Sequence, residues 1–510
     1  MQQQQEREQW GSRAGFLFAA IGSAIGLGNI WRFPYVAYDN GGGAFLLPYL
    51  VALLTAGIPV LILAYTMGHR FRGSPPLAFR RLHPRAEVIG WWQVGVSFVI
   101  AAYYAVIIAW AVRYAGFSVG QDWADDPAGF FSGEFIQAGE PGGITGYVSG
   151  VAWPLVAVWV VVIVVLLFGV RRGIQRLNMV FIPLLAVLFG ILVVRAVTLD
   201  GAELGLDALF SPDWDAITDG GVWVAAYGQI FFSLSVGFGI MITYASHLHR
   251  KADLSGSALV AGFANSSFEI LAGIGVFAAL GFMAASTGVA VGDVAESGVG
   301  LAFIAFPQII STLTGGAGFF GVLFFASLVV AGLTSLISIV QVVVSAVQDR
   351  TGMARTPAVL IVGGVLAVLS VGLFSTAQGL PYLDVADHFI NSYGVALAAL
   401  VMVVVVAWVL RQVPALRQHA NATSIVHVGL WWQVMLGVVT PVVLGWMMYD
   451  SLRQEFEANY GDYTSGFLVI GWGVAVGVIV VAVVLSLIPW RRPDDFVAEE
   501  LPVAEKGRRS

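Results

Sequence analysis

The sequence predicts an all-α integral membrane protein with twelve transmembrane helices. Of its 510 residues 58% are hydrophobic and 11% are charged, and the mean hydropathy is +0.83, which is too apolar for a soluble domain. A helix needs about 20 apolar residues to cross a bilayer. Twelve runs are long enough to be expected as spans: 13–38, 42–68, 88–119, 151–170, 178–197, 221–247, 257–285, 318–347, 356–376, 385–410, 427–450 and 465–489.

The positive charges orient these spans, because Lys and Arg are retained on the cytoplasmic side during insertion. With a cytoplasmic N-terminus, all but four of the 25 Lys and Arg residues fall on that side. The loops expected outside are acidic, as in "QDWADDPAGFFSGE" (121–134). The polar start "MQQQQEREQW" lacks the features of a secretory signal, so we expect the first span to be retained. We expect a multi-pass protein of the cell membrane with both termini cytoplasmic.

Residue types argue against several kinds of site. The chain has no cysteine, which excludes disulfides and thiolate metal sites. No nucleotide motif is complete, and "GFGI" (237–240) is only a fragment of a glycine fingerprint. We therefore expect no organic cofactor, no nucleic-acid partner and no enzyme activity. The histidines are scattered over span ends and loops without a serine or metal motif: His69, His83, His247, His249, His388, His419 and His427.

Two of the expected spans are interrupted by glycine and serine. The first carries "GSAIGLGNIWRFP" (22–34), with a polar Asn29 and a charged Arg32, and the sixth carries "FFSLSVGFG" (231–239). An offset of five spans is odd, so the two units must be inverted relative to each other in the membrane. Interrupted spans at matching positions in two halves are the best sequence indication of a transporter binding site.

This symmetry divides the chain into a first repeat with spans 1–5, a second with spans 6–10, and two further spans. In order, we expect a cytoplasmic segment 1–12, the first inverted repeat 13–197, an extracellular loop 198–220, the second inverted repeat 221–410, spans 11 and 12 at 411–490, and a cytoplasmic tail 491–510.

An opened helix leaves backbone N–H and C=O groups that lipid cannot satisfy. Freed N–H groups suit a carboxylate, whereas freed carbonyls suit an amine or a metal cation. The alternative is that the glycines only permit close helix packing. Two matched interruptions favour a binding site.

Three stretches resemble spans 1, 6 and 8 of the neurotransmitter:sodium symporter family, and above all its bacterial amino-acid members of the LeuT type. They are "GSAIGLGNIWRFPYVAYDNGGGAFLLPYL" (22–50), "GQIFFSLSVGFGIMITYAS" (228–246) and "AGLTSLISI" (331–339). The resemblance implies the LeuT fold, a 5+5 inverted repeat with helices 1 and 6 broken at mid-membrane. It also implies sodium-coupled symport by alternating access.

The resemblance further implies two co-transported Na⁺ ions, and neutral oxygen dipoles are suitable ligands for such an ion. One site would use the substrate's carboxylate with Ala24, Asn29, Ser233 and Asn265. The other would use carbonyls of Gly22, Ile25 and Ala331 with the hydroxyls of Thr334 and Ser335. Taken singly, those two hydroxyls could instead bond back to their own helix.

The same family pattern implies a substrate site between the broken helices, in which Phe232 and Tyr104 form a lid. Monoamine carriers of the family have Asp where this chain has Gly26, so the ligand should bring its own carboxylate. This favours a neutral, apolar amino acid. The implied site comprises Ser23, Ala24, Gly26, Leu27, Gly28, Ile100, Ala101, Tyr104, Phe232, Ser233, Ser235, Phe238, Ser335 and Ile339.

Charges within or beside apolar spans are costly unless they are paired. Arg32 and Asp387 match the family's outer gate pair, and Arg7, Trp10 and Asp349 match its inner latch. A solvated charge at the membrane surface is the alternative for Arg7 and Asp349. In the latch region this chain has His247 where many relatives have Tyr, which leaves the packing of the latch open.

The fifth span reads "GIQRLNMVFIP" (173–183), with Pro183 ten residues after Gly173. Proline removes a helix hydrogen bond, so this stretch can unwind at modest cost. The spacing resembles one that bacterial relatives use to admit water to the second sodium site. An ordinary kink after a helix-start glycine is the alternative.

Glu269 lies one helical turn after Asn265. Chloride-dependent relatives have Ser at this place and bind chloride with residues that match Tyr49, Gln229 and Ser233. The inference is that Glu269 supplies the negative charge in fixed form, so no chloride is needed. We expect the carboxylate to take up a proton when sodium leaves, which would make the carrier a proton antiporter. Satisfaction of Glu269 by neighbouring hydroxyls is the alternative.

Two other functions remain open at this stage. A non-cycling amino-acid sensor would keep the pocket without gates or release machinery, and a symporter of another small zwitterion would share the site. The sequence specifies neither the particular amino acid nor the oligomeric state.

Overall fold

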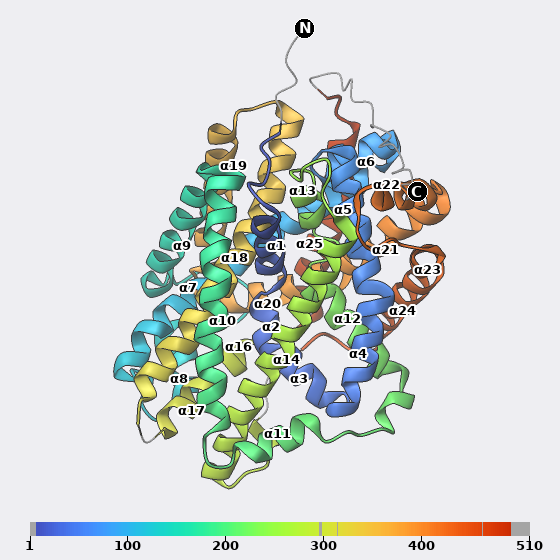
Figure 1. Cartoon of the computed structure of the whole chain (residues 1–510). Helices are drawn as coiled ribbons and strands as arrows, with labels where there is room; N and C mark the ends of the chain where they lie inside the picture. The colour runs from blue at the N-terminus through green and yellow to red at the C-terminus, as the bar shows by residue number, and fades with distance from the viewer. Residues whose placement is uncertain (1–6, 295–297, 314, 462, 491–510) are drawn as a thin grey trace.

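The computed structural model describes residues 7–294, 298–313, 315–461 and 463–490, which form a bundle of helices (Figure 1). The expected tail 491–510 and residues 1–6 of the expected N-terminal segment lie outside the described residues. The helices of the expected spans are α1 (Arg13–Ala24), α2 (Leu27–Trp31), α3 (Phe33–Asp39), α4 (Leu46–Ala52), α5 (Ile58–Phe71), α7 (Glu87–Gly120), α9 (Ser149–Leu167), α10 (Arg176–Val197), α12 (Gly220–Ser233), α13 (Ile240–Ala245), α14 (Leu254–Thr287), α18 (Ala317–Thr351), α19 (Arg355–Phe374), α20 (Gly379–Phe389), α21 (Ala396–Val404), α23 (Leu430–Val434), α24 (Thr440–Glu457) and α25 (Ser465–Leu487).

Several helices, of the spans and of the loops, are joined or extended by π-helical turns. Such turns often mark functional positions in a helix. They are Leu53–Gly57, Phe130–Phe135, Val170–Gln175, Leu301–Ala305, Ile390–Val395, Val405–Val409 and Met435–Val439.

In the described residues, ten continuous helical runs are long and apolar enough to cross a membrane, and the bent pair α1 and α2–α3 raises the number to eleven. The expected sixth span is built from α12 and α13, which are each too short to meet that criterion. The all-α architecture is therefore as expected, whereas the count of twelve spans is not reached by length and composition alone.

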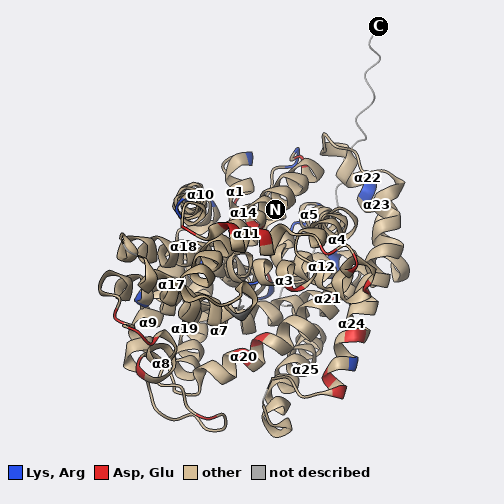
Figure 2. Cartoon of the chain, turned by 90° about the horizontal axis from the view of Figure 1, so that it is seen from below, with Lys and Arg blue, Asp and Glu red and all other residues tan. Residues whose placement is uncertain are grey.

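Short helices occupy the connections at both ends of the bundle. The helices α6 (Pro75–Leu82) and α22 (Val413–Thr423), from loops expected on one side of the membrane, lie toward one end in Figure 1. The opposite end carries α8 (Pro127–Gly129), α11 (Ala202–Phe210) and α17 (Phe306–Thr312), with α15 (Val291–Val294) and α16 (Gly298–Gly300) in the same connection as α17. Seen along the bundle from the α11 end, charged residues are sparse among the helices (Figure 2).

Both expected interruptions are present. The first span bends by 57° between Ala24 and Leu27. In the sixth, α12 ends at Ser233 and α13 begins at Ile240, and Gly237 between them has a φ of +89°, which favours glycine. Carbonyl and N–H groups near these breaks are thereby released from the regular helix pattern.

The two broken spans lie against long, continuous helices. The helices α7 and α18 pack against each other, and α1 packs against α10, α14 and α18. The contact of α1 with α10 is close at Gly22, where an added Cβ would overlap Oδ1 of Asn178. Glycine at this position therefore brings the first break next to the fifth span.

A hydrogen bond between two histidines connects α22 with the bundle. Nδ1 of His69, at the end of α5, shares a hydrogen bond of 2.9 Å with Nε2 of His419 in the loop helix α22. Burial, together with the positive charges of Arg70 and Arg72, lowers the pKa of His419 to about 4. In the folded protein, His419 is therefore neutral at pH 7.

We predict that His419→Asn makes the thermal stability less dependent on pH between about 6.5 and 4. In that window the unfolded chain takes up a proton at His419, whose usual pKa is about 6.5, while the folded chain does not, so the parent loses stability as the pH falls. Melting temperatures at pH 7.5 and pH 5 measure this loss. His427→Asn, at an exposed position, is the control, and an equal loss in the parent and in His419→Asn would contradict the prediction.

Candidate functional site

A cavity of about 530 Å³ begins at the two breaks and extends to α20 and the segment after α24. All the substrate-site residues expected from the sequence line it except Ala101, which is fully buried within α7. The cavity also reaches residues that the sequence did not indicate: Trp31, Tyr103, Ile107, Gly298, Val299, Gly300, Leu380, Leu383, Asp384, His388, Asn391, Ser392 and Tyr460.

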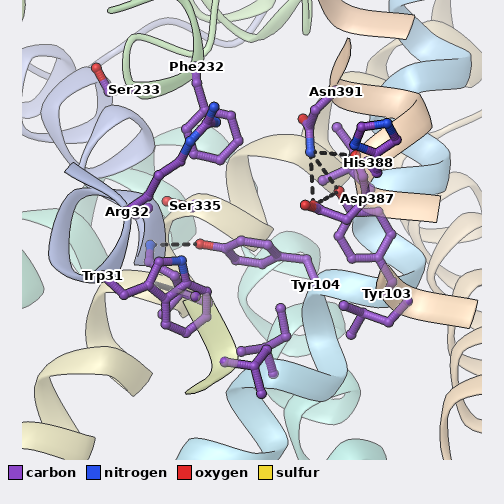
Figure 3. Close-up of a pocket in the computed structure, with 18 of the residues that line it drawn as sticks. Trp31, Arg32, Tyr103, Tyr104, Phe232, Ser233, Ser335, Asp387, His388 and Asn391 are labelled. Atoms are coloured by element: carbon purple, nitrogen blue, oxygen red, sulfur yellow. Dashed lines mark hydrogen bonds between the residues drawn. The ribbon is translucent and has the colours of Figure 1, made fainter. Parts of the chain in front are cut away.

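Tyr104 connects α7 with the first break. The backbone N–H of Leu27 donates to its hydroxyl at 3.1 Å, and Figure 3 shows the ring extending across the cavity toward the broken helix. Because this oxygen already accepts a hydrogen bond, its own proton is available to an acceptor in the cavity. On the other side, an added Cβ on Gly28 would overlap the ring of Phe232. Glycine thus lets the aromatic side chain lie directly against the first break.

The lining combines a polar end with apolar walls. The side chains of Ile100, Phe238 and Ile339 contribute apolar surface. Ser23 contributes a hydroxyl to the lining, and it accepts from the hydroxyl of Ser338 at 2.9 Å. Such a cavity has polar groups to orient a ligand and an apolar compartment for its side chain.

Three of the residues expected at the first sodium site form one hydrogen-bonded cluster. Asn29 Nδ2 donates to Asn265 Oδ1 at 2.9 Å, and Asn265 Nδ2 donates to Ser233 Oγ at 3.1 Å. Asn29 Oδ1 in turn accepts from the N–H of Gly26 at 2.8 Å. The cluster joins α2, α12 and α14, and its side chains supply neutral oxygens.

Residues expected at the second sodium site come from α1 and α18. Ser335 Oγ lies 3.2 Å from the carbonyl oxygen of Ile25 and 3.4 Å from that of Gly22, so its hydroxyl reaches across to the break. Thr334 instead donates to the carbonyl of Ala331 in its own helix at 2.9 Å. One of the two hydroxyls thus meets the freed carbonyls, and the other bonds back to its helix.

Glu269 is fully buried and stands beside the first cluster, one turn from Asn265 on α14. Gln229 Nε2 donates to its Oε1 at 2.6 Å, and the Tyr49 hydroxyl donates to its Oε2. The expected partners Tyr49 and Gln229 are therefore in contact with the carboxylate, whereas the Ser233 hydroxyl accepts from Asn265 in the neighbouring cluster.

The expected outer gate pair is separated in this structure. The Arg32 guanidinium lies 4.7 Å from the centre of the Phe232 ring, and Asp387 accepts from the Tyr103 hydroxyl at 2.7 Å and from Asn391 Nδ2 at 2.8 Å (Figure 3). Among the described ion pairs none joins Arg32 to Asp387, although both line the cavity. The cavity is therefore continuous past this gate toward the α20 end. One feature of the sequence could have identified Tyr103 as a cavity residue, namely its position next to Tyr104.

The expected inner latch is closed. Arg7 Nη1 lies 3.1 Å from Asp349 Oδ2, and Trp10 is 1% exposed with its indole N–H donating to the carbonyl of Tyr244 at 2.9 Å. His247 takes part as well, since its Nδ1 shares a hydrogen bond of 2.6 Å with the carbonyl of Glu8. The side chain of His247 is thus in contact with the N-terminal segment.

The segment from Gly173 to Pro183, which was expected to unwind during sodium release, is helical in this structure. Gly173 lies in the π-helical turn Val170–Gln175, and Pro183 lies inside α10. Proline leaves one carbonyl of the preceding turn without its helix partner.

Comparison with known proteins gives one consistent similarity. Residues 7–126 and 122–492 match the model of the sodium:neurotransmitter symporter family. The chain is 40% identical over 482 residues to an uncharacterized sodium-dependent transporter of Methanocaldococcus jannaschii, covering 94% of this chain and 98% of that protein. It is 28% identical over 557 residues to the human sodium- and chloride-dependent neutral and basic amino acid transporter B(0+), covering 95% of this chain and 86% of the relative.

Among solved structures, the chain is similar to MhsT in complex with L-phenylalanine. The TM-score is 0.73 at 32% identity, and the match covers 87% of this chain and 100% of the MhsT chain. The similarity therefore extends over nearly the whole length of the protein.

We predict that Glu269→Ala lowers the free energy of unfolding by about 2–5 kcal/mol, because the Tyr49 hydroxyl and the Gln229 amide lose their buried acceptor. Thermal melts in detergent, with and without denaturant, measure the loss. Glu134→Ala, at an exposed loop position, is the control. Equal melting of the two variants would show that the carboxylate does not hold these donors.

Proposed function

Since the chain belongs to the sodium:neurotransmitter symporter family, we propose that it couples the entry of two sodium ions to the uptake of a neutral, apolar amino acid. As a member of that family it is a multi-pass, sodium-dependent membrane transporter and not an enzyme. Its likeness to MhsT confirms the all-α LeuT fold that the resemblance of spans 1, 6 and 8 implied. The ion count, the substrate and independence of chloride are the finer part of the proposal.

The main support for this proposal is that neutral oxygen atoms lie close together at the two helix breaks. The amides of Asn29 and Asn265 with the Ser233 hydroxyl form one group, and the Ser335 hydroxyl with the carbonyls of Gly22 and Ile25 forms the other. A hard monovalent cation is well served by such dipoles in place of its water. Each group contains parts of a broken span and of a continuous helix, so an ion bound there would hold the two together.

The site favours a ligand that carries its own carboxylate and an apolar side chain. A Cβ at Gly26 would lie 3.1 Å from both the Tyr104 and Ser335 oxygens, so glycine leaves this space open for a ligand group. The Tyr104 proton is available to a carboxylate, and Ile100, Phe238 and Ile339 offer apolar contact. The complex of MhsT with L-phenylalanine supports an apolar amino acid as substrate.

Two sodium ions supply enough energy for concentrative uptake. Each ion that enters down about 100 mV and a tenfold gradient yields about 2.3 plus 1.4 kcal/mol. Two ions could therefore concentrate a zwitterion by about 10⁵-fold at the thermodynamic limit.

Alternating access would use the two gates in turn. The present arrangement, with the cavity continuous past Arg32 and Asp387 and with Arg7 paired to Asp349, fits an outward-facing state. Closure of the outer gate would bring Arg32 toward Asp387, and opening of the latch would follow. Unwinding between Gly173 and Pro183 would then admit water to the second sodium site.

Glu269 would replace chloride as the source of negative charge near the first sodium site. It is buried one turn from Asn265, with Tyr49 and Gln229 as hydrogen-bond donors. A buried carboxylate without a nearby cation is costly. We propose that it binds a proton after sodium leaves and carries it outward on the return step.

Uptake in proteoliposomes tests the function directly. A panel of the twenty amino acids, with sodium, lithium or choline outside, would identify both substrate and coupling ion. Sodium-driven accumulation of an apolar amino acid is expected. Binding without accumulation would favour an amino-acid sensor, and uptake only of another zwitterion would correct the substrate.

We predict that Thr334→Val combined with Ser335→Ala weakens the apparent sodium affinity of uptake at least about tenfold. The variant loses the Ser335 hydroxyl at the break and the Thr334 hydroxyl, which would turn from the Ala331 carbonyl to the ion. Uptake against sodium concentration measures it. Ser327→Ala removes a buried hydroxyl of the same helix that bonds to Leu323, and serves as the control. Unchanged sodium dependence in the double variant would remove these residues from the site.

We predict that uptake by the parent is the same in chloride and in gluconate, and that Glu269→Ser makes uptake rise at least about tenfold with chloride. Serine removes the fixed charge and leaves the Tyr49 and Gln229 donors to an anion. A parent that needs chloride, or an active Glu269→Ser variant that ignores it, would disprove the role given to this carboxylate.

A further inference from the structure

The side chain of Glu8 lies at the start of the helical run Val170–Val197. Its Oε2 accepts from the N–H of Val170 and its Oε1 accepts from the N–H of Arg171, both at 2.9 Å. The first N–H groups of a helix have no partner within the helix, and a carboxylate there both satisfies them and compensates the helix dipole. Glu8 therefore caps a helix that begins more than 160 residues further along the chain.

The residue before this helix leaves room for that cap. Gly169 has no side chain of its own to cap the helix, and its φ of +87° favours glycine. A Cβ there would lie 2.7 Å from Oε2 of Glu8 and would displace the carboxylate. A second bond lies close by, since the N–H of Gly11 donates to Gln175 Oε1 at 2.7 Å. The N-terminal segment, residues 7–12, is thus fastened to the first two turns of the run.

Two turns further along, the same helix covers the second proposed sodium site. Asn178 and Ile182 pack against Gly22, where an added Cβ would overlap Asn178 Oδ1 and would lie 2.7 Å from Ile182 Cδ1. The carbonyl of Gly22 is one of the proposed sodium ligands, and Asn178 Oδ1 is buried without a hydrogen-bond partner. Loss of these turns would expose the Gly22 carbonyl to water from the latch end.

Glu8 also lies within the inner latch. Arg7 pairs with Asp349 on one side of it, and Trp10 bonds to Tyr244 on the other. The carbonyl of Glu8 itself is held by His247. Withdrawal of this segment when the latch opens must therefore also withdraw the carboxylate from the helix start.

We propose that Glu8 is a positioning residue that couples the inner latch to the fifth span. While the latch is closed, its carboxylate keeps the run wound and the second sodium site covered. When the latch opens, the cap leaves, the turns up to Pro183 unwind, and water reaches the ion. Sodium release then follows latch opening. This inference rests on the proposed function, because it concerns the release of a transported ion.

Hydrogen exchange of the full-length protein in nanodiscs with sodium tests the coupling without a transport assay. Loss of a capping side chain shifts a local helix equilibrium by about three- to tenfold. Glu8→Ala should speed exchange of amides 170–182 by about that factor, while α9 stays unchanged. Glu8→Gln keeps one acceptor oxygen without the charge, so its increase should be smaller. Gln9→Ala, at the neighbouring exposed position, is the matched control and should have no effect.

Two further variants separate coupling from a local cap. Arg7→Ala should weaken the latch and speed exchange of amides 170–182, although Glu8 is intact. Pro183→Ala restores a helix hydrogen bond, so the increase caused by Glu8→Ala should be smaller in that background. A role confined to the first turn would give the same increase in both backgrounds.

The proposal is overturned if Glu8→Ala and Gln9→Ala exchange alike at 170–182, or if Glu8→Ala speeds α9 equally. It is also overturned if Arg7→Ala loosens residues 7–12 without affecting amides 170–182. Sodium-dependent uptake by the parent is measured separately. Its absence would refute the transport function, while the exchange comparison would still decide whether Glu8 couples the latch to the helix.

Discussion

The structure depends on one constraint, that a backbone group inside a membrane needs a hydrogen-bond partner. Most of the chain meets it with continuous helices. At Ala24–Leu27 and Ser233–Ile240 the helix pattern is interrupted, and side chains from neighbouring helices move in. Tyr104 takes up the N–H of Leu27, and Ser335 reaches the carbonyls of the first break. These polar groups converge in an otherwise apolar bundle. The two breaks, which cost helix hydrogen bonds, therefore also supply the polar groups of the binding site.

The continuous helices decide how that site is closed. Close packing at Gly22 places the fifth span directly over carbonyls that we assign to sodium. The helix start of that span is held by Glu8 on the N-terminal segment, and the same segment is held by Asp349 and Tyr244. The latch, the helix start and the proposed ion site are therefore joined by one continuous series of contacts.

Electrostatics set a second condition, because a bundle with few charges must place each buried charge beside a partner. Glu269 is held by Tyr49 and Gln229 next to a cluster of neutral oxygens. Asp387 is held by Tyr103 and Asn391, which satisfies it while the outer gate is open. Arg32 lies over Phe232 meanwhile. Each gate residue thus has a partner in this arrangement, so neither charge is left uncompensated while the two residues are apart.

The sequence by itself determined the spans, the two breaks and most of the residues around the cavity, because apolar length, glycine and serine act locally along the chain. Tertiary structure decided which side chains meet. Ser335 reaches the first break while its neighbour Thr334 bonds to its own helix, and Ala101 lies outside the cavity although Ile100 lines it. Two further contacts join residues far apart in sequence. Glu8 accepts a hydrogen bond from the first residue of the fifth span, and Tyr103 donates one to Asp387. These outcomes depend on the rotation and spacing of packed helices, which no local pattern specifies.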